Sequence, residues 1–334
     1  MRNARDTIRV SPWRFGLVIG AVVLVAGNAW AAQGAKGTIN ISLGSIKQVG
    51  DLPQLVAAKI LADAGYTVTF QEFSGNDQMV QALLRNEADF GAGAMTPVMT
   101  AIAKGADLKI LFETVRLDYV LATKSALKSV DQLHGARVGI FSTGSDTHLC
   151  LQLTLDGRPA VKPQLLIGGF SSARVQAMLA GQMDGSVIQL VDWLRLKAQG
   201  GDRFHLLQTY ATDFPDIFSK VGFVRPSLLS QNHQVVEDYI RANVQAARKL
   251  KQGGVQAVEA AIRETLPKID PAAVPEIAKV YSGLPLWPTD GGLSPRGQEK
   301  TYEALVRIGF IPSGRKPFFE RGPLDKVLKE IGNE

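Results

Sequence analysis

Hydrophobic and polar positions along the chain follow two spacings in turn. Residues 38–43 and 66–72 alternate apolar and polar side chains and are rich in β-branched residues, which is typical of half-buried strands. Residues 52–64 carry apolar side chains at helical spacing up to Gly65, and residues 77–85 do the same. Further expected elements are strands at 89–92, 108–114 and 119–123 and a helix at 97–103. This alternation predicts an α/β fold with a largely parallel sheet.

A second round of the same alternation begins near Leu127. We expect strands at 137–141, 164–167, 184–188 and 204–208, and helices at 147–155, 172–180 and 190–198. From Pro226 onward the pattern is mostly helical with prolines at the joins, and the expected helices cover 234–252, 255–265 and 272–281. The second round therefore predicts a second α/β unit within the chain.

The two rounds resemble each other in sequence. Residues 80–89 (VQALLRNEAD) correspond to residues 175–184 (VQAMLAGQMD), 95 positions later. Each copy reads as a helix that ends in a polar turn, followed by an aspartate that opens a short strand. Two such copies fit two similar lobes. The alternative is that this order of helix, turn, aspartate and strand is a frequent combination in α/β proteins.

The N-terminus has the parts of a secretory signal peptide. Four arginines precede an apolar run from Phe15 to Ala26, and the segment ending at Ala31 contains small residues suited to cleavage. We expect residues 1–31 to be removed and the protein to be periplasmic. The alternative, an uncleaved membrane anchor, is disfavoured because the apolar run is shorter than the roughly 20 residues that a span requires. No cysteine near the end of the run indicates a lipid anchor.

Charge and cysteine content narrow the class of protein. The formal net charge is +6, of which residues 1–31 contribute four arginines and one aspartate, leaving +3 for the rest. No stripe of Lys and Arg indicates nucleic-acid binding, whereas a mild basic excess suits an anionic ligand. The single cysteine, Cys150, cannot form a disulfide within the chain, and no His/Cys spacing indicates zinc. We expect neither a metal nor a cofactor.

Ligands of open α/β sheets bind outside the carboxyl ends of the strands, which nominates the loops rich in Gly, Ser and Thr. The strongest candidate runs from Ser142 to Thr147, between a strand and a helix, where free N–H groups and the helix dipole form an anion site. The alternative is ordinary helix capping by Ser145 or Asp146. The predicted ligand-binding residues are Ser45, Ser74, Asn76, Thr96, Ser142, Gly144, Ser145, Thr147 and Asp192.

Catalysis is the less favoured interpretation, and we assign no catalytic residue. His148 and Cys150 are two positions apart on an expected helix, so they point to different faces. Cys150 lies between two leucines and reads as a small buried hydrophobe. No catalytic sequence motif of a hydrolase or metalloprotease is present.

Several segments, in their order and spacing, resemble the nitrate/sulfonate/taurine-type branch of periplasmic binding proteins. These segments are KSVDQLHGARVG at 128–139, STGSDTH at 142–148, the paired turns at 87–91 and 182–185, and the late helix at 232–242. The resemblance implies a type II periplasmic-binding-protein fold with a ligand cleft between two lobes. One lobe would comprise 37–121 and 222–334 and the other 126–218, with hinge segments near 121–125 and 219–224.

The resemblance also implies a function. The protein would capture a small anionic organic solute by lobe closure and deliver it, as a monomer, to an ABC permease in the inner membrane. Two alternatives remain open at this point. One is an enzyme on the same fold, desulfinase-like or pyrimidine-forming, that uses Cys150 or His148; the other is a solute sensor. No nucleic-acid partner is expected.

Overall fold

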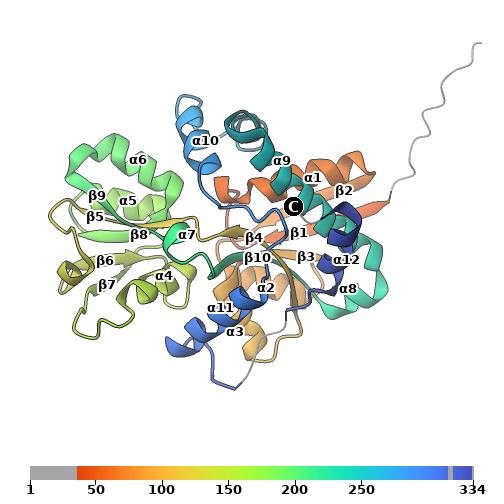
Figure 1. Ribbon diagram of the computed structural model, residues 1–334, viewed down its shortest axis with the longest axis horizontal. Coiled ribbons are helices and arrows are strands. Elements are labelled where there is room, and N and C mark those ends of the chain that lie inside the picture. Colours follow the sequence, from red (N-terminus) through yellow and green to blue (C-terminus); the bar gives the residue numbers. More distant parts are fainter. Residues whose placement is uncertain (1–35, 315–318, 333–334) are drawn as a thin grey trace, which may run out of the picture. The chain divides into compact units, whose positions relative to one another are not determined.

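The computed structural model describes residues 36–314 and 319–332. The predicted signal peptide, residues 1–31, lies outside this range. The described chain contains two five-stranded sheets, each accompanied by its own helices (Figure 1). We name them sheet A and sheet B. No helix within 36–314 and 319–332 has the length and apolar character needed to cross a membrane.

Sheet A has the strand order β2-β1-β3-β10-β4. β1 pairs in parallel with β2 and β3, whereas β10 is antiparallel to both β3 and β4. Gly37 lies opposite Tyr66, and Ile41 lies opposite Phe90. The strands are β1 (Gly37–Leu43), β2 (Tyr66–Glu72), β3 (Phe90–Ala94), β4 (Lys109–Arg116) and β10 (Phe218–Val224).

Sheet B repeats this topology with the order β7-β6-β8-β5-β9. β6 is parallel to β7 and β8, and β5 is antiparallel to β8 and β9. Each sheet is therefore mixed: four of its strands run in one direction, as expected, and one strand, β10 in sheet A and β5 in sheet B, runs in the opposite direction, because it enters its sheet after a crossing. The strands are β5 (Tyr119–Lys124), β6 (Arg137–Ile140), β7 (Gln164–Ile167), β8 (Gly185–Gln189) and β9 (Phe204–Thr209).

Helices connect the parallel strands and cover the sheets. Those of the first round are α1 (Leu52–Asp63), α2 (Asn76–Leu84) and α3 (Met95–Ala103). Those of the second round are α4 (Asp146–Leu155), α5 (Ser171–Leu179), α6 (Leu190–Gly200) and the short α7 (Tyr210–Asp213). The later helices are α8 (Pro226–Gln231), α9 (His233–Thr265), α10 (Val274–Ser282), α11 (Pro295–Arg307) and α12 (Gly322–Ile331).

The two expected helices at 234–252 and 255–265 together form α9, which is kinked at Gly254. The backbone there has φ 55° and ψ −140°, a conformation that only glycine adopts without strain. The expected interruption is therefore present, as a kink that changes the direction of the helix axis.

The sequence repeat is a structural repeat. Asn86 and Gly181, 95 positions apart, both end their helix with a positive φ, 64° and 73°. The Asp89 carboxylate accepts a hydrogen bond from the Asn40 N–H at 2.8 Å, and the Asp184 carboxylate accepts one from the Arg137 N–H at 3.0 Å. Each aspartate thus fixes the same helix-to-strand turn to the equivalent strand of its own sheet, β1 in sheet A and β6 in sheet B.

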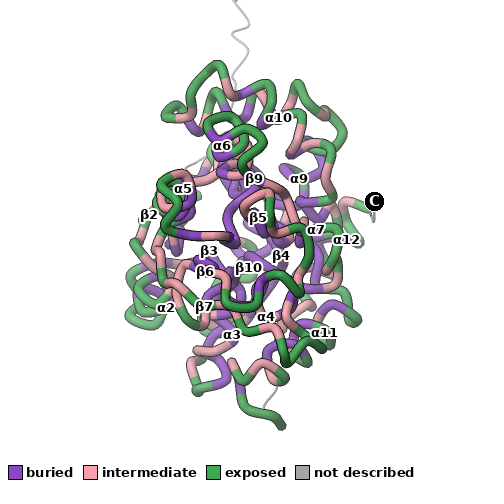
Figure 2. Tube along the Cα trace, turned by 90° about the vertical axis from the view of Figure 1, so that its left-hand side faces the viewer, coloured by how far each residue is buried: buried purple, intermediate pink, exposed green. Residues whose placement is uncertain are grey.

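The most buried strands lie at or next to the centre of each sheet (Figure 2). Every residue of β3, β8 and β10 is buried. Strands that are buried along their whole length are expected where helices cover both faces of a sheet. Around these strands the core continues into α1, α9 and α12 beside sheet A and into α4 and α5 beside sheet B.

The chain passes from sheet A to sheet B at residues 117–118 and returns at residues 210–217. These passages lie a few residues before the predicted hinge segments, 121–125 and 219–224, which are largely taken up by β5 and β10. The reason is strand pairing: β5 pairs along its whole length in sheet B, and β10 does so in sheet A. The lobes and their hinge remain a proposal about motion.

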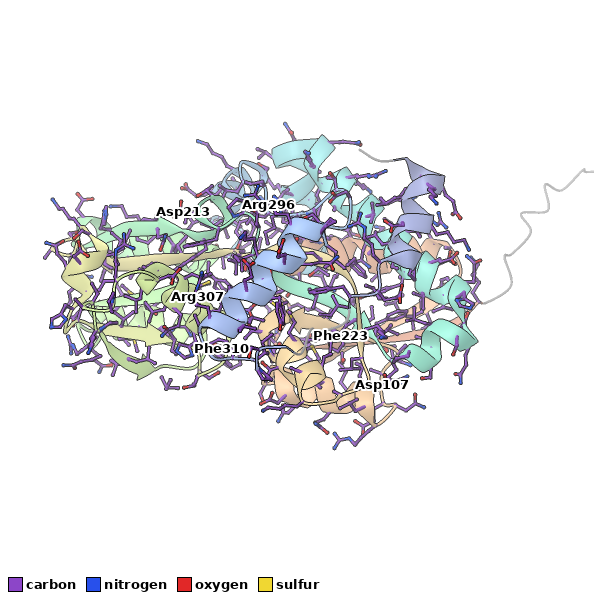
Figure 3. All side chains as sticks on the ribbon, turned by 60° about the horizontal axis from the view of Figure 1, so that its bottom comes forward. Asp107, Asp213, Phe223, Arg296, Arg307 and Phe310 are labelled. Carbon is purple, nitrogen blue, oxygen red and sulfur yellow. The ribbon has the colours of Figure 1, made fainter. Side chains whose placement is uncertain are left out.

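α11 forms a further link between the parts of the fold (Figure 3). Arg296 near its start pairs with Asp216 of the return passage at 2.8 Å. Arg307 at its end pairs with Asp156, just after α4, at 3.0 Å. Beyond the helix, the Phe310 ring lies 5.0 Å from the ring of His148, centroid to centroid. Because both ion pairs are largely exposed, each contributes at most about 1 kcal/mol.

Candidate functional site

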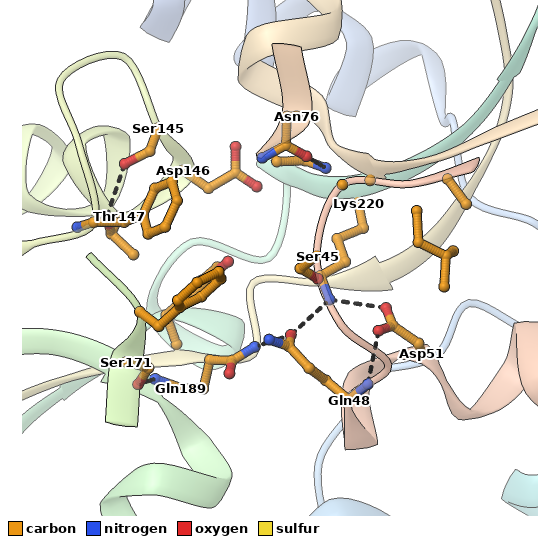
Figure 4. A pocket seen from close by; sticks show the side chains of 18 of the residues that line it. Ser45, Gln48, Asp51, Asn76, Ser145, Asp146, Thr147, Ser171, Gln189 and Lys220 are labelled. Atoms are coloured by element: carbon orange, nitrogen blue, oxygen red, sulfur yellow. Dashed lines mark hydrogen bonds and ion pairs between the residues drawn. The ribbon is translucent and has the colours of Figure 1, made fainter. Parts of the chain in front are cut away.

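A pocket opens where strand ends of the two sheets face each other (Figure 4). Sheet A and its loops contribute residues on one side, and sheet B and its loops contribute residues on the other. The lining residues are Leu43, Gly44, Ser45, Gln48, Asp51, Asn76, Ala92, Gly93, Ala94, Tyr119, Phe141, Ser145, Asp146, Thr147, Phe170, Ser171, Arg174, Gln189 and Lys220. The pocket therefore needs both sheets to be complete.

Four helices begin at this pocket: α1 and α2 beside sheet A, and α4 and α5 beside sheet B. Each helix follows a strand whose carboxyl end points to the same place, as the repeated topology requires. The N-terminus of a helix carries unpaired N–H groups and the positive end of the dipole. This arrangement favours negative charge or hydrogen-bond acceptors in the pocket.

The repeat extends into the pocket walls. Asn76, the first residue of α2, accepts a hydrogen bond on Oδ1 from the Ala94 N–H at 3.0 Å. Ser171, the first residue of α5, accepts one on Oγ from the Gln189 N–H at 3.0 Å. Both pairs are again 95 positions apart. Each bond ties a helix start to the strand-to-helix turn beside it and holds the corresponding pocket wall in place.

Lys220 on β10 is the buried cation on the sheet A side of the pocket. Its Nζ donates to Asp51 Oδ1 at 2.8 Å and to Gln48 Oε1 at 3.2 Å. The side chains of Lys220 and Asp51 are 8% and 7% exposed, so little water screens the pair. Burial lowers the pKa of Lys220, but the carboxylates of Asp51, Asp118 and Asp146 outweigh it and the pKa is raised. Lys220 is therefore charged at neutral pH.

Two further buried aspartates lie near this ammonium group. Neither carboxylate oxygen of Asp118 has a hydrogen-bond partner within the described residues, and burial raises its pKa to about 6. Asp146 accepts hydrogen bonds from the Thr96 N–H at 3.2 Å and from Ser219 Oγ at 3.3 Å. Burial raises the pKa of Asp146 to about 6 as well, despite these donors. The ammonium group of Lys220 is thus the buried counter-charge of three carboxylates, those of Asp51, Asp118 and Asp146.

Side chains connect the two sheets directly across the site. Gln189 at the end of β8 donates from Nε2 to Gln48 Oε1, which also accepts from Lys220. On the other side of the pocket, Asp146 of α4 reaches α3 and β10 through its bonds to Thr96 and Ser219. The two walls therefore contact each other around the pocket in this structure.

Arg174 is the second buried cation of the pocket, on the sheet B side. It is 1% exposed. Its Nε donates to Ser186 Oγ at 3.1 Å, and its two terminal nitrogens donate to the carbonyl oxygens of Val187, at 2.8 Å, and Gly169. Burial lowers its pKa to about 10, so the guanidinium stays charged at neutral pH.

Aromatic side chains complete the lining. Phe141 and Phe170, which follow β6 and β7, lie with ring centroids 5.6 Å apart and tilted by 53°. Phe170 is 40% exposed, which is unusual for so large an apolar side chain. Tyr119 at the start of β5 also lines the pocket. The sheet B wall thus offers an apolar surface next to a buried positive charge.

Four of the nine predicted ligand-binding residues line the pocket: Ser45, Asn76, Ser145 and Thr147. Ser145 caps α4, accepting from the His148 N–H at 3.3 Å, and its Oγ lies 2.8 Å from Thr147 Oγ1. Thr147 Oγ1 in turn accepts from the Phe141 N–H at 2.8 Å. The capping alternative is therefore realised at Ser145, in a loop that also borders the pocket.

The other five predicted residues do not line it. Ser74 is exposed and donates to Gln78, Thr96 is buried beneath Asp146, and the Asp192 carboxylate pairs with Arg195. In the expected anion loop, the Ser142 N–H is directed at Ser145 Oγ at 3.4 Å. Gly144 has φ 78°, and its N–H donates to His148 Nδ1 at 3.1 Å. These N–H groups are used within the loop, because the tight turn folds them back onto its own side chains.

The enzymatic alternative would use Cys150 or His148, and the structure places both in the interior. Cys150 is a fully buried residue of α4, and burial raises the pKa of its thiol well above the ordinary value. A buried thiol of this kind is mostly protonated and unreactive. His148 is buried as well, and burial lowers its pKa. Within the described residues, no group of His, Cys, Asp or Glu side chains is placed to hold a metal ion.

Sequence reasoning missed the charged residues of the pocket. Lys220 had a usable signal, since it is the only charged residue in the apolar run Phe218–Val224 (FSKVGFV). Arg174 also had one, because the corresponding position of the first copy of the repeat, 95 residues earlier, is Met79. Asp51 had no comparable signal, because a polar residue before a helix is most often a cap.

The sequence matches one protein family, and the structure is similar to several solved structures. Residues 61–253, more than half of the chain, match the model of a family described as NMT1/THI5 like. No curated protein matches the sequence.

Solved structures with similar folds come from several organisms. A ligand-binding component of an ABC-type import system from Staphylococcus aureus, with zinc bound, has a TM-score of 0.72 at 15% identity, over 87% of this chain and 99% of that one. The alkanesulfonate-binding protein SsuA from Xanthomonas axonopodis pv. citri, bound to MOPS, has a TM-score of 0.66 at 20% identity, over 85% and 97%. The periplasmic nitrate-binding protein NrtA from Synechocystis PCC 6803 has a TM-score of 0.70 at 12% identity, over 88% and 89%. These likenesses show that the chain has the periplasmic-binding-protein fold.

Proposed function

The chain belongs to the NMT1/THI5-like family, and from this premise we propose that it is the extracytoplasmic solute-binding component of an ABC importer. It would capture a small anionic organic solute and deliver it to a permease in the inner membrane. The observation that carries the proposal is a single pocket lined by two sheets of equal topology that are joined by two short passages.

The proposed mechanism is closure of one sheet and its helices on the other. A solute that contacts both walls stabilises the closed arrangement, because only a difference in affinity between two states can shift their populations. Residues 117–118 and 210–217 would act as the hinge, because the chain passes from one sheet to the other at these two places. The similar structures support this proposal. One is named as a component of an ABC-type import system, one as an alkanesulfonate-binding protein and one as a nitrate-binding protein.

The choice of an anionic solute rests on the pocket itself. Four helix starts and two buried cations, Lys220 and Arg174, surround it. Asp51 and Asp146 also line the pocket, but both carboxylates already have partners. Asp51 accepts from Lys220, and Asp146 accepts from Thr96 and Ser219. The cation of the sheet B wall, Arg174, has no carboxylate among its hydrogen-bond partners within the described residues and is therefore the stronger candidate for contact with an anion.

A thermal-shift screen tests the proposed function. The purified protein would be mixed with sulfonates, nitrate, aliphatic and aromatic carboxylates and pyrimidines. A bound solute at 100 times its dissociation constant adds about 2.7 kcal/mol to the free energy of unfolding. For a chain of this size that raises the midpoint by roughly 5–10 °C. The compound should be recovered unchanged after incubation, whereas its conversion to product would point to the enzymatic alternative.

The bond between Gln48 and Gln189 gives a test of closure. Gln189→Ala removes the donor of this bond between the two walls, and we expect it to shift the protein toward an open arrangement by about 1 kcal/mol. Small-angle X-ray scattering of the ligand-free variant should then show a larger radius of gyration than wild type. The double variant Gln48→Ala/Gln189→Ala should enlarge the radius little further, because the other bond of Gln48 Oε1, from Lys220, lies on the sheet A side and does not join the two walls. An unchanged radius in both variants would argue against the bond as a closing contact.

A further inference from the structure

The repeat provides an internal comparison for one pocket residue. α2 and α5 begin with residues that make the same hydrogen bond, from the Ala94 N–H to Asn76 and from the Gln189 N–H to Ser171. Three residues further along each helix lie Met79 and Arg174, 95 positions apart. The two side chains therefore occupy equivalent positions in frames of the same construction.

The fold does not require a charge at this position. Met79 is 0% exposed, and a side chain built on Gly93 would lie only 2.6 Å from its sulfur. In sheet A an unbranched apolar side chain thus fills the space beneath the strand. Arg174 is equally buried, at 1%, yet it brings a guanidinium into the interior. Burying a charge costs several kcal/mol unless something compensates for it.

No carboxylate provides that compensation within the described residues. The three hydrogen bonds of Arg174 go to neutral oxygens, those of Ser186, Gly169 and Val187. Burial lowers the pKa of Arg174, and Tyr119 and Asp192 raise it, but the Asp192 carboxylate is paired with Arg195. A guanidinium has five N–H donors, so the three bonds leave donor capacity as well as charge.

Two other arginines, the partly buried Arg225 and the buried Arg248, show what a purely structural role looks like. Arg225 donates to the carbonyl oxygens of Leu83 and Ala88, both at 2.6 Å, and so fixes the end of α2. Arg248 likewise donates to three carbonyl oxygens, those of Thr289, Ile331 and Gly332. Neither residue lines the pocket, whereas Arg174 does. Bonds to carbonyl oxygens therefore orient Arg174 but do not explain its place in the pocket.

We infer that Arg174 selects the charge of the solute, and that the pocket takes a ligand with a carboxylate or sulfonate group on the sheet B wall. The Ser171 and Ser145 hydroxyls and the start of α5 lie on the same wall. The apolar surface of Phe141 and Phe170 beside them suits the organic part of such an acid. This inference rests on the proposed function, because it names the chemical group that the proposed site recognises.

The test compares acids with their neutral counterparts. Acetate, benzoate, methanesulfonate and benzenesulfonate would be titrated beside acetamide, benzamide, methanesulfonamide and benzenesulfonamide, by calorimetry, into wild type and three variants. Arg174→Met places the residue of the first copy in the second. Arg174→Lys keeps the charge without the planar fork, and Arg225→Met is a matched control that removes a carbonyl-binding arginine away from the pocket.

We expect wild type to bind at least one acid and to bind its amide much more weakly. Arg174→Met should weaken binding of the acid by about 10- to 100-fold, Arg174→Lys by less, and Arg225→Met not at all. Circular dichroism of the ligand-free variants checks that each is folded. If Arg174→Met does not fold, Arg174→Lys and the comparison of acid with amide in wild type still decide the matter.

Three results would overturn the inference. One is equal binding of an acid by folded Arg174→Met and wild type. Another is equal binding of an acid and its amide by wild type, and the third is no binding of any acid. In each case the wider screen separates the two proposals. A solute found there that carries no acid group would leave the importer function standing, and the failure of every compound would contradict the function as well.

Discussion

Replacing Lys220 by methionine is expected to lower the free energy of unfolding by about 3–5 kcal/mol at pH 8, the usual cost of removing one partner of a buried ion pair. Lys220 lies between Asp51, Asp118 and Asp146 and is the cation to which Asp51 is bonded. Methionine keeps the apolar stem within β10 but leaves the buried carboxylates without a counter-charge. Urea unfolding followed by circular dichroism measures the loss.

The loss should be smaller at pH 5 than at pH 8. The pKa of both Asp118 and Asp146 is raised to about 6, chiefly by burial, from an ordinary 3.8. Their protonated forms therefore stabilise the fold, and that contribution is present below about pH 4 and lost as the pH rises through 6. At pH 5 both groups are largely neutral and depend less on Lys220.

A second substitution controls for lost packing. Asp118→Asn removes one of the uncompensated charges, so Lys220→Met/Asp118→Asn should recover about 1–2 kcal/mol at pH 8 and little at pH 5. An equal loss at both pH values, with no recovery in the double variant, would mean that Lys220 stabilises the protein by packing and not by charge.

Glu113→Gln is expected to raise the free energy of unfolding by about 3 kcal/mol at pH 9. Glu113 lies in the middle of β4 and is 3% exposed, and its Oε1 has no hydrogen-bond partner within the described residues. Burial raises its pKa to about 8 from an ordinary 4.5, while Arg116 lowers it and Asp290 raises it. The neutral acid therefore stabilises the fold at low pH, and this contribution is lost as the pH rises through 8.

The pH profile distinguishes this effect from general stabilisation. Wild type should lose stability between about pH 4.5 and 8, the ordinary and the raised pKa of this group, and Glu113→Gln should lose much less. At pH 5 the two should agree within about 1 kcal/mol, because the carboxyl group is then neutral in wild type as well. Asp290→Asn is a matched control, since it removes a neighbouring negative charge and should only lower the pKa of Glu113. Parallel profiles for wild type and Glu113→Gln would show that Glu113 is already ionised at pH 6.

Local pattern was sufficient to predict most of the fold. The repeat at 80–89 and 175–184 predicts two similar units, and the structure has two sheets of the same strand order. Such prediction is possible because helix spacing, strand alternation and a turn residue such as Gly181 depend on near neighbours in the chain. Strand direction was harder to predict, because β5 and β10 pair with strands that are distant in sequence.

The pocket was predictable as a place but not as a set of charges. The rule that ligands bind at the carboxyl ends of strands indicated the right loops, and Ser45 and Thr147 do line the pocket. Lys220 and Asp51, in contrast, are 169 positions apart in sequence. Whether a charged side chain is buried depends on which distant groups the fold brings to it, and a single sequence does not contain that pairing.

The place of β10 has a consequence for how the protein is made. All strands of sheet B come from one continuous stretch, Tyr119 to Thr209, whereas sheet A requires β10 between β3 and β4. A chain that folds as it emerges from its N-terminus can therefore finish the second sheet first. Until residues 218–224 are made, β3 and β4 each present an open edge, the kind of surface that pairs with other chains. Sheet A is therefore begun first and completed last, and the intermediate that lacks β10 is the one that most needs protection from aggregation.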